Sequence, residues 1–249
     1  MAERIWCLQK IRLFEQLPAA DIEFLEAHSR SRTFPRNTPV YFPEDAADCV
    51  FVLVEGRIRL SSITSDGKEG ILALIEPGEL FGELAILGSD VREEHARCVE
   101  NSKVVSIRRE AIESVLLRNA HLSLSITRLM GLRRQRIERR LRHLLFRSSR
   151  ERLAGLLCEL AEQYGRKVSD GILIDIRLSH QDLAGLVGTS RESATLTLGE
   201  LRREHLIRVE SRRFVVLRAD LLSVEAGEVP RRKRPTGQGV RGIGHAGSW

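Results

Sequence analysis

The stretch LSHQDLAGLVGTSRESATLTLGELRR, residues 178–203, contains two short apolar patterns of helical spacing. The apolar positions are Leu183, Leu186 and Val187 in the first half and Ala194, Leu198 and Leu201 in the second. Gly188 separates the two halves and interrupts the pattern, as a turn residue does. The stretch therefore predicts a helix-turn-helix, a motif whose second helix can lie in the major groove of DNA.

Both predicted helices begin with a polar cap. Ser179 with Asp182, and Thr189 with Glu192, have the spacing at which a hydroxyl and a carboxylate satisfy free backbone amides at a helix N-terminus. This spacing predicts that one helix begins after Ser179 and the other after Thr189.

Two motifs, taken together, resemble those of the Crp/Fnr family of bacterial transcription regulators. G-x-S-R-E opens the second predicted helix at residues 188–192, and PGELFGELAIL at residues 77–87 is similar to the family's phosphate-binding cassette. The resemblance covers residues 10–222. It implies an α+β fold made of an N-terminal antiparallel β-barrel of the jelly-roll, cyclic-nucleotide-binding-like type, a long dimerisation helix and a C-terminal winged helix-turn-helix.

The chain is expected to divide into four segments. They are a sensory barrel over residues 1–118, a dimerisation helix over 119–147, a winged helix-turn-helix DNA-binding domain over 148–224 and a basic tail over 225–249. Residues 227–249 are rich in Gly, Pro and Arg and lack an apolar pattern, so we expect the tail to be disordered. Such a tail either adds nonspecific affinity for DNA or is solvated without a specific role.

Charge is distributed unevenly along the chain. Residues 1–118 carry 15 Lys and Arg against 20 Asp and Glu, residues 119–147 carry 8 against 1, and residues 148–249 carry 17 against 13. The rear part is therefore expected to meet a polyanion. No apolar run reaches the roughly 18 residues that span a bilayer, and the first residues lack the apolar core of a signal peptide. We expect a cytoplasmic protein without a membrane partner.

The front half has the pattern of short strands. Residues 50–63 and 69–81 alternate or run apolar, and Asp66-Gly67 between them predicts a hairpin turn. Residues 13–29 have a helical apolar pattern and predict a short helix packed on the barrel. Family members commonly have glycine at the position of Glu44, where glycine permits a positive φ, so this departure questions the geometry of one turn.

The cassette is the candidate effector site. Its candidate residues are Gly82, Glu83, Leu84, Ala85, Arg92 and Glu93. Gly82 removes a side chain where a helical turn begins, so that successive amides could face an anion. The resemblance assigns Glu83 to the ribose hydroxyl of a cyclic nucleotide and Arg92 to the cyclic phosphate.

The residues around Arg92 depart from the nucleotide-binding pattern. Family members usually have Pro before this arginine and a small residue after it, whereas here Val91 precedes it and Glu93 and Glu94 follow. These carboxylates would repel a phosphate, and we expect Arg92 to pair with one of them. We therefore expect that the cassette has lost its ligand or binds another small effector, and classical binding of a cyclic nucleotide is the remaining alternative.

Residues 119–146 predict one long helix. Met130, Ile137 and Leu144 recur every seven residues, and Leu141 falls between the last two, which is the seam expected when two such helices pair in a homodimer. Arg134 interrupts this seam. The other arginines of the helix are expected mostly to be solvated or to face the acidic barrel, with DNA phosphates as the alternative.

The second helix of the helix-turn-helix carries the candidate base contacts. Arg191 suits guanine and Glu192 suits cytosine, although Glu192 could instead serve only the cap of Thr189. Leu196 stands where many family members have a second base-reading arginine, and it either contacts a thymine methyl or packs inward. The remaining candidates for the DNA interface, chiefly through phosphates, are Ser179, Thr189, Ser190, Thr195, Arg202, Arg212 and Arg213, the last two near the tip of a predicted wing.

No residue set predicts catalysis or a resident metal. The four cysteines are scattered without a C-x-x-C pair, and only Cys7 lies near the N-terminus, which disfavours an iron-sulfur cluster. His95 and Cys98 would lie on opposite faces of a strand, which disfavours haem or metal ligation. Motifs for nucleophilic catalysis, zinc hydrolysis and phosphate loops are missing, so the sequence predicts a non-enzyme.

Two functional hypotheses follow. The first is a homodimeric, sequence-specific regulator that binds palindromic double-stranded DNA and responds to a small effector in the barrel. The second is a ligand-independent architectural or constitutive DNA-binding protein whose barrel serves dimerisation and protein contacts. The resemblance also gives RNA polymerase as a candidate partner.

Overall fold

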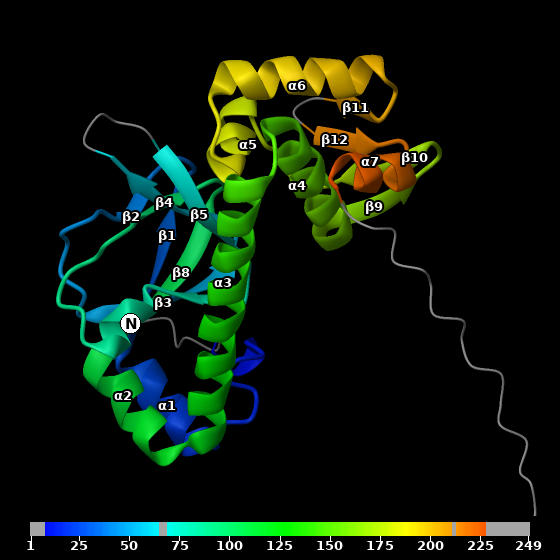
Figure 1. The fold of residues 1–249 in the computed structure, drawn as a ribbon. Coiled ribbons are helices and arrows are strands. Elements are labelled where there is room, and N and C mark those ends of the chain that lie inside the picture. The colour runs from blue at the N-terminus through cyan, green and yellow to red at the C-terminus, as the bar shows by residue number, and fades with distance from the viewer. Residues whose placement is uncertain (1–7, 65–68, 211–212, 228–249) are drawn as a thin grey trace, which may run out of the picture.

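The computed structural model describes residues 8–64, 69–210 and 213–227, and it consists of two halves joined by one long helix (Figure 1). The front half begins with the 3-10 turn η1 (Leu8–Lys10) and helix α1 (Ala19–Ala27). Its strands are β1 (Ser29–Phe34), β2 (Pro39–Tyr41), β3 (Cys49–Glu55), β4 (Ile58–Ile63), β5 (Glu69–Ile75), β6 (Leu80–Phe81), β7 (His95–Cys98) and β8 (Ser102–Arg108). The 3-10 turn η2 (Glu83–Leu87) follows β6, and helix α2 (Arg109–Arg118) follows β8.

The strands form two antiparallel four-stranded sheets. One has the order β1-β8-β3-β6 and the other β2-β7-β4-β5. Residues that alternate along the strands face the space between the sheets, where Leu53, Ile58 and Phe81 are fully buried. The two sheets form an open roll, so the expectation of a barrel is confirmed in its strand content but not in its closure.

Three local predictions can be compared with the roll. Strands β4 and β5 pair as the expected hairpin, while its tip, with Asp66 and Gly67, lies outside the described residues. Glu44 adopts a φ of 72°, so this turn keeps the left-handed geometry that glycine commonly provides. The helix predicted over residues 13–29 is shorter than expected, because Pro18 occupies the position before the first turn of α1.

Helix α3 (Ala120–Phe146) extends along the roll, as Figure 1 shows. Asn119 caps it by accepting a hydrogen bond from the backbone amide of Leu122. Leu122 and Ile126 are buried in a cluster formed with α1, α2 and the β1-β8-β3-β6 sheet. The expected long helix is confirmed, and it ends at Arg147, just before the cap of the next helix.

The rear half is a compact helical unit with a small sheet. Its elements are α4 (Ser149–Tyr164), β9 (Gly165–Val168), β10 (Gly171–Ile174), α5 (His180–Val187), α6 (Arg191–Arg203), β11 (Ile207–Glu210), β12 (Arg213–Val216) and α7 (Ala219–Glu225). The strands have the order β11-β12-β10-β9. Leu157, Leu183, Leu201 and Phe214 are almost completely buried between the helices and this sheet. The winged helix-turn-helix is therefore confirmed as a fold.

Helix α7 packs on α4 and was not predicted. Arg150 of α4 joins α4 to both α6 and α7. Its guanidinium pairs with Glu200 of α6, with Glu204 just after α6, and with Glu225 of α7. Hydrogen bonds to Glu204 and Glu225 raise the pKa of Arg150 above its ordinary value. Among the described helices, none is long and apolar enough to cross a bilayer.

Gly165 follows the last residue of α4. Its φ is −77°, which any residue adopts, so a left-handed cap does not explain the glycine at this position. A Cβ atom at Gly165 would instead lie 1.9 Å from the backbone carbonyl oxygen of Ala161. Glycine is required here because two backbone segments approach each other closely.

We predict that Gly165→Ala destabilises the protein by roughly 1–3 kcal/mol, since the added methyl group forces the backbone apart. Gly131→Ala is the matched control: it lies in α3 with nothing within 4 Å of an added Cβ, so it should stabilise the helix by up to about 1 kcal/mol. Urea unfolding of both variants measures the difference. Equal stability of the two variants would contradict this explanation of Gly165.

Candidate DNA interface and effector pocket

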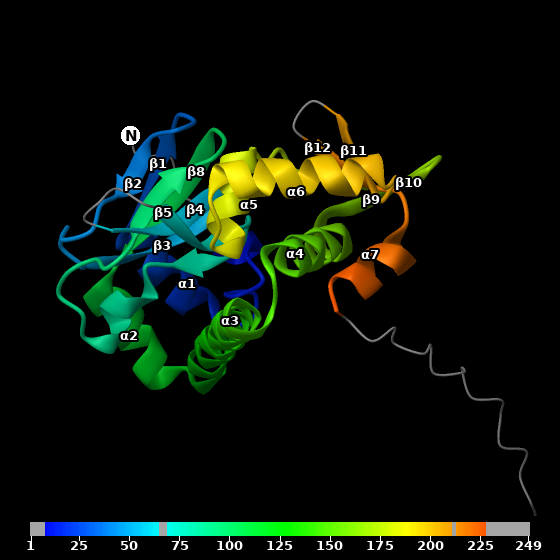
Figure 2. The ribbon, with the colours of Figure 1, turned by 45° about the horizontal axis from the view of Figure 1, so that its top comes forward.

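The second helix of the helix-turn-helix lies on the outer side of the rear half. Gly188 adopts a φ of 67° and makes the turn between α5 and α6. Ala194, Leu198 and Leu201 of α6 are buried against the domain, as the helical pattern predicted. Figure 2 shows α6 running across the top of α4, with its other face directed away from the domain. This exposed face is the candidate reading surface.

The candidate base-contacting side chains lie on the exposed face of α6. Arg191 and Glu192 in its first turn are exposed, and so is Arg202 in its last turn. Leu196 is 70% exposed, so the alternative that it packs inward is wrong. Thr195 is also exposed, but its hydroxyl donates to the Arg191 carbonyl oxygen at 2.8 Å and lies 2.9 Å from Nδ1 of His180.

The caps of the two helices differ from the prediction at one position. Ser179 and Asp182 form the predicted capping box of α5. Helix α6, however, is capped by Ser190, whose Oγ accepts a hydrogen bond from the backbone amide of Ser193 at 3.1 Å, so the predicted cap at Thr189 is wrong by one residue. The amide of Glu192 and the Ser190 hydroxyl lower the pKa of the Glu192 carboxyl.

The wing is the hairpin of β11 and β12. Arg213, predicted to contact phosphate, forms an ion pair with Asp175 at 3.3 Å, with both side chains partly exposed. Arg208, the neighbouring arginine on β11, pairs with Asp170 at 3.1 Å. Arg212 lies outside the described residues.

The cassette residues surround η2 at the end of β6. Gly82 has a φ of 68° and precedes the turn, Ala85 is fully buried, and Glu93 is exposed. The Glu83 carboxylate forms an ion pair with Arg133 of α3, with 2.6 Å between Oε2 and Nη1. The carboxylate that the resemblance assigned to a ribose hydroxyl is thus bound by the protein's own long helix.

Arg92 points into the roll and not toward the acidic residues beside it. Only 5% of it is exposed. Its Nη1 donates to the Gly82 carbonyl oxygen at 3.0 Å and its Nη2 to the Cys49 carbonyl oxygen. The guanidinium carbon also lies 4.8 Å from the ring centroid of Tyr41 and 5.1 Å from that of Phe51.

The predicted pairing of Arg92 with Glu93 or Glu94 is therefore wrong. Glu94 instead accepts a hydrogen bond from the Tyr41 hydroxyl at 2.7 Å, and burial raises the pKa of both groups. Two backbone carbonyls bind the two terminal nitrogens of the guanidinium, while its buried Nε has no hydrogen-bond partner among the described residues. The contacts of Arg92 with these carbonyls could not be inferred from neighbouring residues alone.

As arranged, these residues do not fit a cyclic phosphate. A Cβ at Gly82 would lie 2.7 Å from Nη1 of Arg92, so the guanidinium fills the space that a phosphate would enter. Binding a phosphate would require Arg92 to give up two carbonyl contacts and its stacking on two aromatic rings. Burial also raises the pKa of the adjacent Cys49 thiol to about 12.

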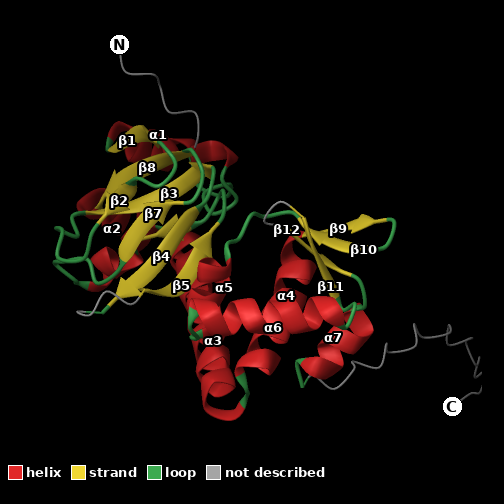
Figure 3. Cartoon of the chain, turned by 90° about the horizontal axis from the view of Figure 1, so that it is seen from above, coloured by secondary structure: helices red, strands yellow, loops and turns green. Residues whose placement is uncertain are grey.

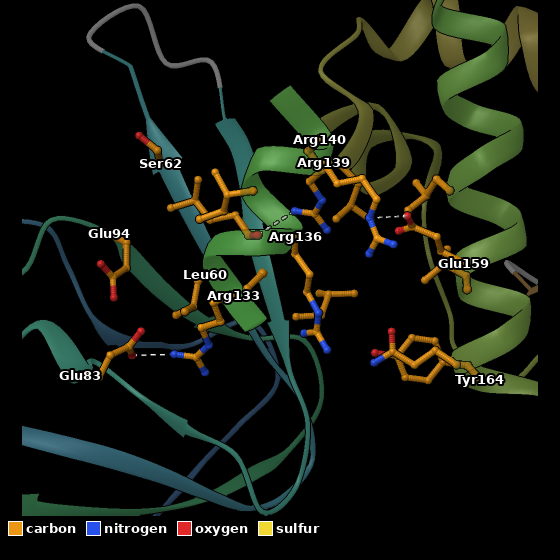
Figure 4. Close-up of a pocket in the computed structure, with 18 of the residues that line it drawn as sticks. Leu60, Ser62, Glu83, Glu94, Arg133, Arg136, Arg139, Arg140, Glu159 and Tyr164 are labelled. Atoms are coloured by element: carbon orange, nitrogen blue, oxygen red, sulfur yellow. Dashed lines mark hydrogen bonds and ion pairs between the residues drawn. The ribbon is translucent and has the colours of Figure 1, made fainter. Parts of the chain in front are cut away.

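A pocket opens between the roll and helices α3 and α4 (Figure 4). Its volume is about 660 Å³, and it is bounded by strands β4 and β5, helix α3 and helix α4. Leu60 and Leu74 line the roll side, and Leu156 and Leu160 line the α4 side. Helix α3 contributes Arg133, Arg136, Arg139, Arg140 and Ile137. Sequence reasoning expected these arginines to be solvated or to face the acidic barrel, with DNA phosphates as the alternative, and did not predict a pocket.

Comparisons with known proteins agree with both halves of this arrangement. Residues 31–119 match the model of the cyclic nucleotide-binding domain, and residues 151–224 match that of the Crp-like helix-turn-helix domain. The global nitrogen regulator of Nostoc sp. is 32% identical over 77% of this chain and 86% of its own length. The anaerobic regulatory protein of Bacillus subtilis is 30% identical over 82% of this chain and 86% of its own. The chain belongs to the Crp/Fnr family of transcription regulators.

A solved structure shares the fold of this Crp/Fnr regulator. The c-di-GMP responsive global regulator CLP of Xanthomonas campestris superposes with a TM-score of 0.72 and 26% identity, over 80% of this chain and 99% of that one. The α+β architecture of roll, long helix and helix-turn-helix is therefore that of the family.

Some of the residues of α3 that were predicted to contact a second subunit pack within this regulator's own chain. Met130 is half-buried against the roll cluster, which makes it an intramolecular packing residue. Leu144 lies against the turn of the helix-turn-helix, because a Cβ at Gly188 would come within 2.8 Å of its Cδ2. Ile137 and Leu141 remain 56% and 54% exposed.

The regulator's two halves also contact each other directly. Arg59 of β4 pairs with Asp182 of α5 at 2.7 Å and with Glu69 of β5 at 3.1 Å. Ile71 of β5 is buried within the hydrophobic cluster of the rear half, and a Cβ at Gly185 would lie 3.2 Å from its Cγ1. Figure 3, seen from above, shows α5 beside β5. Sequence reasoning missed this contact, because it joins residues more than a hundred positions apart.

His95 and Cys98 do not form a metal site. His95 stacks on Phe42, with 5.1 Å between the ring centroids, whereas Cys98 belongs to the cluster inside the roll. The expectation that they point to opposite faces of the strand is confirmed. Among the described residues no group of three or more His, Cys, Asp and Glu side chains could hold a metal ion.

We predict that Ser190→Ala lowers the free energy of unfolding by about 1 kcal/mol, because the first turn of α6 loses its cap. Thr189→Ala removes the neighbouring hydroxyl and should change stability by less than about 0.5 kcal/mol. Urea unfolding without DNA measures both. The original assignment of the cap to Thr189 would be restored if the two effects were reversed.

Proposed function

We propose that this Crp/Fnr regulator is a homodimer that binds a palindromic DNA site and acts by binding, not by catalysis. The observation that carries the proposal is the exposed face of α6, which presents Arg191, Glu192 and Leu196 while its opposite face is buried. A paired protein places two such helices in successive major grooves, with half-sites about one helical turn apart.

The side chains of α6 are suited to different parts of a DNA site. Arg191 can donate two hydrogen bonds to guanine, Glu192 can accept from cytosine, and Leu196 can contact a thymine methyl. We assign the remaining candidates, chiefly Ser190, Thr195 and Arg202, to phosphates, which position the domain without reading sequence. The wing arginines Arg212 and Arg213, the turn residue Thr189 and the cap residue Ser179 complete the proposed interface.

The proposed dimer forms along the exposed apolar side of α3. Leu124 and Leu145 are separated by a whole number of seven-residue repeats, and Leu141 lies between them; these side chains are 48%, 65% and 54% exposed. Exposed leucines at this spacing favour a partner helix, because pairing would remove these apolar side chains from water. The proposed seam keeps Leu141 from the seam predicted by the sequence, and it has Leu124 and Leu145 in place of Met130.

We further propose that a small effector other than cyclic AMP controls the protein through the pocket beside α3. Support comes from Arg92, whose terminal nitrogens bond to two carbonyl oxygens inside the roll, and from the pocket of about 660 Å³ that touches both halves. The same internal contacts of Arg92 and the Glu83–Arg133 pair favour the second candidate, a ligand-independent DNA-binding protein. A thermal midpoint that no cellular metabolite shifts would favour that second candidate. If this protein activates transcription, we propose that it also contacts RNA polymerase.

We predict that Arg191→Ala relaxes specificity at one base pair of each half-site by about 1–3 kcal/mol. Arg202→Ala is the matched control, and it should weaken binding to all sequences to a similar degree because it serves phosphate. Binding to a selected palindrome and to single-base variants at one salt concentration measures both. Uniform weakening by Arg191→Ala would make Arg191 a phosphate contact.

We predict that Leu141→Glu raises the dimer dissociation constant at least about tenfold, because two carboxylates would meet in the apolar seam. Leu117→Glu is the control, since Leu117 is 91% exposed on α2, away from α3's seam. Analytical ultracentrifugation measures the equilibrium. A variant at Leu141 that dimerises like the parent would place the dimer contact elsewhere.

A further inference from the structure

His180 is the first residue of helix α5, and it lies beside the candidate reading helix. Its Nδ1 is 2.9 Å from Oγ1 of Thr195, an exposed residue of α6. The imidazole is itself half-exposed, so this contact places it at the edge of the surface that α6 presents. In a bound helix-turn-helix the first helix crosses the phosphate backbone while the second lies in the groove. His180 therefore lies where a side chain of the first helix can reach a phosphate.

The hydrogen bonds of Thr195 determine which ring nitrogen of His180 carries a proton. A threonine hydroxyl has a single proton, and Thr195 donates it to the carbonyl oxygen of Arg191 at 2.8 Å. The hydroxyl oxygen can then only accept a hydrogen bond from His180, so Nδ1 is the protonated nitrogen. In the neutral ring the other nitrogen, Nε2, therefore has no proton and cannot donate.

A DNA phosphate requires the opposite of what the neutral ring offers. Its oxygens accept hydrogen bonds and carry negative charge, so the lone pair of Nε2 would be repelled by them. A proton taken up from solvent makes Nε2 a charged donor and leaves the contact of Nδ1 with Thr195 intact. Histidine is the side chain whose charge ordinarily changes between about pH 5 and 8. A phosphate contact by His180 therefore requires proton uptake within this range.

The protein's own carboxylates do not take the place of that phosphate. The charged side chains on the elements next to His180 are Asp182 of α5, Arg177 of the loop before it, Arg191 and Glu192 of α6, and Arg59 and Glu69 of the roll. Asp182 and Glu69 both pair with Arg59, at 2.7 and 3.1 Å. Glu192 and the two remaining arginines are exposed, so water screens their charges. A phosphate beside the ring would add negative charge that favours the protonated imidazole.

We propose that His180 is a proton-coupled DNA contact, whose protonated imidazole donates from Nε2 to a phosphate while Nδ1 stays bound to Thr195. The inference rests on the DNA binding proposed above and adds to that interface a residue whose contribution depends on pH. Each subunit takes up at most one proton at this position when DNA binds. The affinity of the dimer for DNA therefore rises as the pH falls through the range in which histidine becomes charged.

The test measures the affinity of the full-length protein for a selected palindrome at about pH 6 and about pH 8, at one salt concentration. The parent should bind about tenfold more tightly or better at the lower pH, because each of two subunits gains a charge-assisted contact. His180→Gln should lose most of this increase, because glutamine takes up no proton. His180→Arg should bind with similar affinity at both pH values, because its charge does not titrate.

Salt dependence separates a phosphate contact from a purely structural effect of His180. One phosphate contact changes the slope of log affinity against log salt concentration by about one. The parent's slope should therefore be steeper at the lower pH by about one for each subunit, and the slope of His180→Gln should be equal at both. NMR of the ring nitrogens in the parent without DNA, at about pH 8, should show the proton of His180 on Nδ1.

His121→Gln is the matched control. His121 is an exposed histidine at the start of α3, so this variant should keep the parent's pH dependence and salt slopes. The inference is overturned if His180→Gln also keeps them, if the parent binds equally at both pH values, or if Nδ1 lacks the proton. If the parent binds the palindrome no better than random duplex, the proposed function fails too, whereas specific binding that is unaffected by His180→Gln contradicts this inference alone.

Discussion

The packing of strand β5 against helix α5 fixes where the reading helix lies. Ile71 reaches from the roll into the core of the rear half, and Arg59 holds Asp182 at the start of α5. Asp182 is also the capping partner of Ser179, so the same carboxylate organises the helix start and the contact with the roll. The angle between α6 and the long helix α3 therefore depends on this contact, and so does the spacing of two reading helices in a dimer.

The roll has kept the shape of a nucleotide-binding domain while using its polar residues internally. Arg92 bonds to two carbonyl oxygens under a pair of aromatic rings, and Glu83 bonds to α3. Moving this guanidinium would break both carbonyl contacts and its packing on the rings, which disfavours a ligand that needs it. The pocket between β5, α3 and α4 combines charged side chains of both signs with apolar walls, and it is the site at which we propose that an effector binds.

The sequence allowed prediction of features that depend on local spacing. Apolar periodicity located α3 and the helix-turn-helix, and the Ser179–Asp182 cap formed as expected. Where two residues satisfied the same pattern, spacing could not choose between them: Thr189 and Ser190 are both hydroxyl residues before α6, and the backbone used the second. The partners of Arg92 and the burial of Met130 depend on distant segments of the chain. Neighbouring residues therefore predicted the wrong partner for Arg92, and for Met130 they predicted a dimer contact without its packing against the roll.

Arg150 has a consequence that extends beyond the packing of α4 on α7. It neutralises Glu200 and Glu204 from beneath the end of α6, together with Glu225. Glu200 lies on the helix that would approach a polyanionic duplex and Glu204 lies just after its end, where unneutralised negative charge repels phosphates. A residue on the inner side of the domain thus tunes the electrostatic field of the outer surface, and contributes to nucleic-acid affinity without being near enough to touch it.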